Sequence, residues 1–155
     1  MAAAESIRVL VVDDEPTARE IVAQLLRITG FEVLTTDTGE QGLVILRKWR
    51  ERIHWLLTAV RLPGLVDGWI LGDEFHASHP GRPVIYACAE RLRASRTESS
   101  VFIRKPINPA DVLTRVKRLS RSFDPAWPRL LTRTPAAKAG RRATDGLPLG
   151  IEKAE

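Results

Sequence analysis

Cysteine is scarce in this sequence of 155 residues, and its single thiol, Cys88, can form neither an internal disulfide nor a cysteine-based metal cage. No apolar run approaches the roughly 20 residues that a membrane-spanning helix needs. The first residues also lack the basic segment that opens a signal peptide. Together these absences favour a protein of the reducing cytoplasm, without a membrane partner.

A dense stripe of basic side chains with aromatic residues between them, which would indicate nucleic-acid binding, is also missing. The formal net charge is nevertheless +5, and residues 123–155 contribute six basic and four acidic groups to it. We interpret this charge as a solvated surface. Weak binding of nucleic acid through the basic tail is kept as an alternative, and a steep loss of binding with salt would identify it.

Short apolar runs and amphipathic segments alternate five times along the chain. The predicted strands are residues 6–12, 31–35, 53–58, 84–88 and 101–104, and the predicted helices are about 17–29, 39–50, 69–78 and 90–97, with a last one from 108 onward. Thr38 and Asn108 are suited to cap two of these helices. Strands this apolar need cover on both faces, which predicts an α/β fold: a doubly wound, five-stranded parallel sheet flanked by helices.

The periodic pattern stops after about Ser122. We therefore expect one domain over residues 1–122 and a largely disordered, Pro- and Arg-containing tail over residues 123–155. In a doubly wound sheet, chemistry lies beyond the carboxyl ends of the strands. The residues at those ends, and so the candidates for a site, are Asp13, Asp14, Ala59, Cys88 and Lys105.

The residues at the strand ends resemble those of the receiver domain of two-component response regulators, the CheY-like or flavodoxin-like fold. The resemblance covers residues 6–121. It rests on Asp13-Asp14, on Leu62-Pro63-Gly64 with Asp67-Gly68, and on Lys105-Pro106. It implies a site where acidic residues hold Mg²⁺, an aspartate after the third strand accepts a phosphoryl group, and a lysine pairs with that group.

Carried over by this resemblance, Asp13 and Asp14 are the metal-binding acids, Lys105 is the phosphate-pairing lysine, and the bond to Pro106 is cis. The phosphoacceptor position falls on Ala59. A methyl group can neither attack phosphorus nor bind a metal. The pocket therefore has one carboxylate fewer than usual, and we expect Mg²⁺ binding to be weak or lost, leaving no cofactor.

The two switch positions of the family are altered as well. Cys88 stands where the family has Thr or Ser, and a thiol is only a weak hydrogen-bond donor. Phe102 stands at the aromatic switch position and lacks a hydroxyl. With no acceptor, Lys105 or Arg61 is expected to pair directly with one of the two aspartates. A simpler alternative is that Asp13 and Asp14 only cap the first helix.

The leading functional hypothesis is an atypical, single-domain response regulator, a pseudo-receiver that is neither phosphorylated nor an enzyme. It would bind a histidine kinase, a phosphotransfer protein or another response regulator, and a homodimer stays open. Its motif around Pro63-Gly64 resembles single-domain receivers of bacteria, in particular alphaproteobacteria. An ordinary phosphoacceptor receiver with its aspartate replaced by Ala59 is the main alternative. A haloacid-dehalogenase-type phosphatase is disfavoured, because it needs Asp-x-Asp where this chain has Asp13-Asp14-Glu15.

Overall fold

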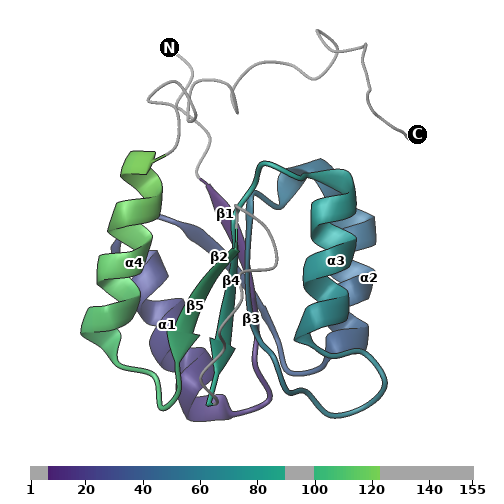
Figure 1. The fold of residues 1–155 in the computed structure, drawn as a ribbon, viewed down its shortest axis with the longest axis horizontal. Coiled ribbons are helices and arrows are strands. Elements are labelled where there is room, and N and C mark those ends of the chain that lie inside the picture. Colours follow the sequence, from purple (N-terminus) through teal and green to yellow (C-terminus); the bar gives the residue numbers. More distant parts are fainter. Residues whose placement is uncertain (1–6, 90–99, 123–155) are drawn as a thin grey trace, which may run out of the picture.

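The computed structural model describes residues 7–89 and 100–122, which form a parallel sheet between two layers of helices (Figure 1). The strands, in the order in which they lie side by side, are β2 (Glu32–Thr36), β1 (Arg8–Val12), β3 (Trp55–Ala59), β4 (Val84–Cys88) and β5 (Ser100–Arg104). The helices are α1 (Pro16–Ile28), α2 (Gly39–Trp49), α3 (Gly68–Ser78) and α4 (Pro109–Ser122), with a short 3-10 turn, η1 (Arg50–Arg52), after α2. The predicted doubly wound α/β fold is confirmed.

The strand order creates a switch point between β1 and β3. The chain leaves β1 for the outer strand β2, and then crosses back to β3 on the other side of β1. Consecutive crossovers therefore leave in opposite directions, and in doubly wound sheets the functional site lies at the carboxyl ends of the two strands at such a switch point. The register pairs Val12 with Thr58, so that Asp13 and Ala59 follow at the same edge of the sheet.

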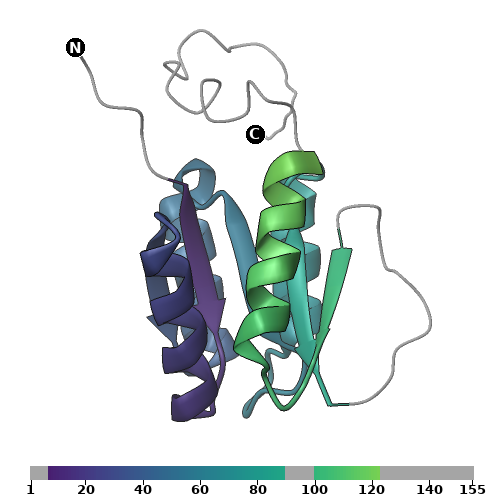
Figure 2. The same cartoon turned by 90° about the vertical axis from the view of Figure 1, so that its left-hand side faces the viewer.

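Two hydrophobic clusters hold the layers together, one on each face of the sheet. Along β1, Val9 and Val11 point to the cluster under α1 and α4, whereas Leu10 and Val12 point to the cluster under α2 and α3. Figure 2 shows α1 and α4 side by side on one face. All five residues of β3 and of β4 are buried, as expected for strands covered on both faces.

The helix starts follow their local signals, but one strand end differs from the prediction. Thr38 accepts a hydrogen bond from the Gln41 N–H, and Asn108 accepts one from the Ala110 N–H at 2.9 Å, as N-caps do. Ala59, predicted to begin a loop, is instead the last residue of β3. The reason is tertiary: its backbone pairs with Ala87 of β4.

Two sequence predictions fall on segments outside the described residues. They are the helix near 90–97 and the tail 123–155. Among the residues that the structure does describe, no helix is both long and apolar enough to cross a membrane.

Candidate functional site

The carboxyl ends of β1, β3, β4 and β5 bring the predicted site residues together. Asp13 directly follows β1, Ala59 ends β3, Cys88 ends β4 and Lys105 directly follows β5. The Lys105 N–H donates to the Cys88 carbonyl at 2.9 Å, which continues the β4–β5 ladder up to the site. The peptide bond from Lys105 to Pro106 is cis, as expected.

A part-buried ion pair joins the ends of β1 and β5 at the site. The Nζ of Lys105 lies 3.0 Å from both carboxylate oxygens of Asp13. The Asp13 side chain is only 3 % exposed and that of Lys105 is 20 % exposed. Asp13 Oδ1 also accepts the Glu15 N–H at 3.0 Å. The expected internal ion pair is thus formed by Lys105 with Asp13, so both oxygens of this carboxylate are already engaged by a cation of the protein itself.

The other acidic groups of the first loop are in a different environment. Asp14 is exposed, and the Glu15 carboxylate lies 3.9 Å from the Lys105 Nζ on the solvent side. The N-cap of α1 is Glu15, which makes no side-chain capping bond. The interpretation of Asp13 and Asp14 as helix caps does not hold for Asp13, because its bonds go to Lys105 and to the loop N–H that precedes the helix.

Ala59 is buried at the same edge of the sheet as this ion pair. It is 1 % exposed, and the start of α3 is packed against its backbone. The Gly68 N–H donates to the Val60 carbonyl at 2.9 Å, and a Cβ on Gly68 would collide with the Ala59 carbonyl oxygen and the Val60 Cα. Because both obstacles are backbone atoms, they cannot rotate away. A glycine at position 68 is what allows α3 to start this close to the end of β3.

Gly68→Ala is therefore expected to lower the free energy of unfolding by about 2 kcal/mol, because the added methyl group must displace the β3–α3 junction. Urea unfolding of the two proteins measures the difference. Gly81→Ala is the matched control: a Cβ there meets no atom within 4 Å, so its effect should be small. Equal effects of the two substitutions would contradict the proposed close approach.

The loop between β3 and α3 is anchored by two carboxylates. Asp67 caps α3 by accepting the Ile70 N–H at 2.9 Å. Glu40 of α2 accepts the Leu65 N–H at 2.8 Å, and this bond to the backbone lowers the pKa of Glu40 below its usual value. The second half of the loop that follows the acceptor position is thus fixed by Glu40 of α2 and by the cap that Asp67 gives to α3.

The two switch positions lie in the hydrophobic layer under α2 and α3. Cys88 is buried and packs in the same cluster that Phe102 borders. Phe102 contacts two aromatic side chains that sequence reasoning did not assign to the site, Tyr86 of β4 and Trp69 of α3. The sequence did contain a signal for Tyr86: it is two residues from Cys88 on one strand, so the two side chains share a face of the sheet.

The residues present do not fit a resident Mg²⁺ ion of the kind that the resemblance implies. Mg²⁺ requires several oxygen ligands in octahedral geometry. At this site Ala59 supplies none, and both oxygens of Asp13 lie against the Lys105 ammonium. Over residues 7–89 and 100–122, no group of three or more His, Cys, Asp or Glu side chains could hold a metal.

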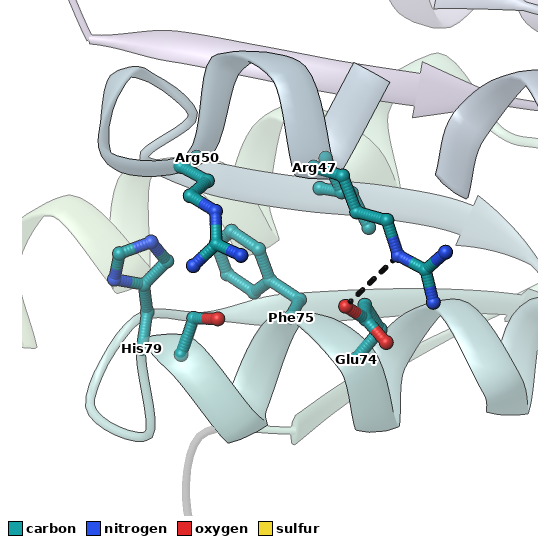
Figure 3. Close-up of a pocket in the computed structure, with 7 residues that line it drawn as sticks. Arg47, Arg50, Glu74, Phe75 and His79 are labelled. Carbon is teal, nitrogen blue, oxygen red and sulfur yellow. Dashed lines mark hydrogen bonds and ion pairs between the residues drawn. The ribbon is translucent and has the colours of Figure 1, made fainter. Parts of the chain in front are cut away.

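A small pocket lies away from this site, between the C-terminal ends of α2 and α3 (Figure 3). It is lined by Leu46, Arg47, Arg50, Glu74, Phe75, Ser78 and His79. The Nε of Arg47 lies 3.4 Å from Glu74 Oε2 across it. Burial, helped by the charge of Arg82, lowers the pKa of His79 to about 3, so this histidine is neutral. The pocket shares no residue with the carboxyl-end site.

Comparison with known proteins decides the family. The family model for the response regulator receiver domain matches residues 9–117. The chain belongs to the response regulator receiver family. It is therefore a receiver of two-component signalling, a class of domain that interacts with histidine kinases.

Relatives of this receiver agree with that assignment. It is 30 % identical over 122 residues to the probable transcriptional regulator ycf27 of Porphyra purpurea, and 31 % identical over 121 residues to the transcriptional regulatory protein AruR of Pseudomonas aeruginosa. The matches cover 76 % and 74 % of this chain but only 49 % of each relative. The chain thus spans about half the length of these curated relatives.

The matches with solved structures cover nearly the whole length of the solved chains. The receiver domain of the hybrid histidine kinase CckA is 32 % identical with a TM-score of 0.62, and the match covers 72 % of this chain and 96 % of that one. A response regulator receiver protein from Sinorhizobium medicae has a TM-score of 0.70 at 22 % identity, covering 77 % and 98 %. The second likeness shows the fold alone.

Proposed function

We propose that this receiver is an atypical one, a pseudo-receiver that is not phosphorylated at the family's acceptor position and acts by binding rather than by catalysis. The observation that carries the proposal is the pair formed by Ala59 and the Lys105–Asp13 bridge. Ala59 places a buried methyl group at the carboxyl end of β3. The lysine that would otherwise pair with a phosphoryl group lies 3.0 Å from Asp13 instead.

The partner that fits this proposal best is a histidine kinase or a phosphotransfer protein. A receiver that keeps the fold but cannot accept the phosphoryl group would occupy the surface that an ordinary regulator uses, and would compete with it. Another response regulator is a second candidate partner within two-component signalling. CckA is a hybrid kinase with its own receiver, and the curated relatives are regulators of transcription. A receiver within a hybrid kinase and a receiver within a transcriptional regulator both act through contact with another part of a signalling system, as we propose for this one.

The proposal predicts that incubation with acetyl phosphate and Mg²⁺ leaves the intact mass of the protein unchanged. At position 59, where the family has its nucleophilic oxygen, this chain has only a methyl group, which cannot form a bond to phosphorus. The measurement is intact-mass spectrometry of the full chain before and after incubation. A gain of one phosphoryl group by the protein as it stands would overturn the proposal.

Two variants distinguish a site that lacks only its phosphoryl acceptor from a site that can no longer support phosphoryl transfer at all. Ala59→Asp supplies the carboxylate, and Ala59→Asn is a control of the same size without a nucleophile. If Ala59→Asp alone gains a phosphoryl group, only the acceptor is missing, and the alternative of an ordinary receiver with a replaced aspartate gains support. If neither variant gains one, the rest of the site is also unable to support phosphoryl transfer.

A further inference from the structure

Three aromatic side chains form a stack under α3, at the place where the family has its β5 switch residue. Phe102 of β5 is the register partner of Tyr86 of β4. Their rings are stacked, with centroids 5.4 Å apart and planes at 23°. Trp69, in the first turn of α3, lies 4.8 Å from the Tyr86 ring and 6.2 Å from the Phe102 ring, which it meets edge-on. Phe102 is thus in contact with two aromatic rings, which also contact each other.

The central ring of this stack has a fixed position. Tyr86 is fully buried. Its hydroxyl fills the place that a Cβ on Gly72 of α3 would occupy, so α3 fits over Tyr86 only because residue 72 has no side chain. Trp69 and Gly72 are three residues apart and so share one face of α3. The helix therefore presents a recess for Tyr86 and, next to it, the indole ring that borders Phe102.

We propose that the Trp69–Tyr86–Phe102 stack holds the partly buried Phe102 against Tyr86, so that Phe102 presents a single conformation to a partner whatever the state of the carboxyl-end site. In the family this residue is expected to move when the site is phosphorylated. Here an outward move of Phe102 would break two ring contacts and uncover the face of the buried Tyr86. The inference rests on the proposed function and deepens it, because constitutive binding needs a surface that does not switch.

Fluorine NMR of the full chain carrying para-fluorophenylalanine tests the stack directly. The sequence has four phenylalanines, so the Phe102 signal is assigned by the loss of one resonance in Phe102→Leu. We expect one Phe102 resonance in the protein as it stands. In Trp69→Ala we expect that single resonance to be lost and a second one to appear. Trp49→Ala is the matched control, because Trp49 stacks with Arg8 and Arg52 rather than with Phe102.

Two results would overturn the inference: two Phe102 resonances in the unaltered protein, or identical Phe102 spectra for the Trp69 and Trp49 variants. Trp69→Leu keeps apolar volume beside Phe102 but removes the indole edge, and it replaces Trp69→Ala if that variant does not fold. If Ala59→Asp gains a phosphoryl group and its Phe102 signal then shifts with Trp69 in place, the stack does not hold the switch. That outcome contradicts only the inference about the stack, whereas phosphorylation of the unaltered protein contradicts the proposed function on which the inference rests.

Discussion

Replacing Lys105 by methionine is expected to lower the free energy of unfolding by about 3 kcal/mol. The substitution removes the cation that lies 3.0 Å from both oxygens of Asp13 and leaves a carboxylate that is 3 % exposed without its partner. Removing one member of a buried pair is costly because the remaining charge has lost its hydration and gains nothing in return. Chemical unfolding followed by fluorescence measures the change.

A double-mutant cycle isolates the pair itself. Asp13→Asn with Lys105→Met replaces both charges by groups of similar shape, and most of the lost stability should return. Arg115→Met is the control, since that side chain is 41 % exposed and pairs with Asp111 along α4 at 3.6 Å, an arrangement worth only a few tenths of a kcal/mol. If the effects of the single variants Asp13→Asn and Lys105→Met simply add up in the double variant, the two side chains act separately.

Acidification is expected to destabilise the protein through His54. Burial, together with the charges of Arg82 and Arg8, lowers the pKa of His54 from 6.5 to about 4. The ring is 4 % exposed, and its Nδ1 accepts the Arg8 N–H at 2.8 Å, a bond that only an unprotonated nitrogen can accept. The folded protein therefore keeps His54 neutral over a pH range in which the unfolded chain protonates it.

The sign of the effect follows from proton counting. Between about pH 6.5 and pH 4 the unfolded state binds one more proton at His54 than the folded state does, so the free energy of unfolding falls as the pH falls. The total loss from this residue is about 3 kcal/mol, and above the unfolded pKa its contribution no longer changes. His79, with a pKa lowered to about 3, acts in the same direction.

His54→Asn tests this without removing the acceptor, because an amide oxygen can take the place of Nδ1 but does not titrate. Unfolding curves of the parent and the variant, measured from pH 7 to pH 4, should differ by an amount that changes by about 3 kcal/mol across the range. Carboxylates and His79 are common to both proteins and cancel in this difference. Parallel pH profiles would mean that the folded protein protonates His54 as readily as the unfolded chain does.

The positions of the candidate site residues could be predicted well from the sequence. Parallel strands meet with their carboxyl ends at one edge, so placing Asp13, Ala59, Cys88 and Lys105 at strand ends was enough to bring them together. The exact end of β3 could not be predicted, because the pairing of Ala59 with Ala87 depends on a strand 25 or more positions later in the chain. The stack around Phe102 was missed for the same reason.

The sequence by itself determined the features that depend on local patterns of residues. The alternation of apolar strands and amphipathic helices specifies the doubly wound sheet, and the residue types at the strand ends specify which groups the site contains and that Ala59 is among them. The tertiary structure alone decided which of these groups meet. Lys105 reaches Asp13 across a separation of 92 residues, and Tyr86 fits under α3 only because position 72 is glycine. Such contacts depend on packing between distant elements, which no local periodicity encodes.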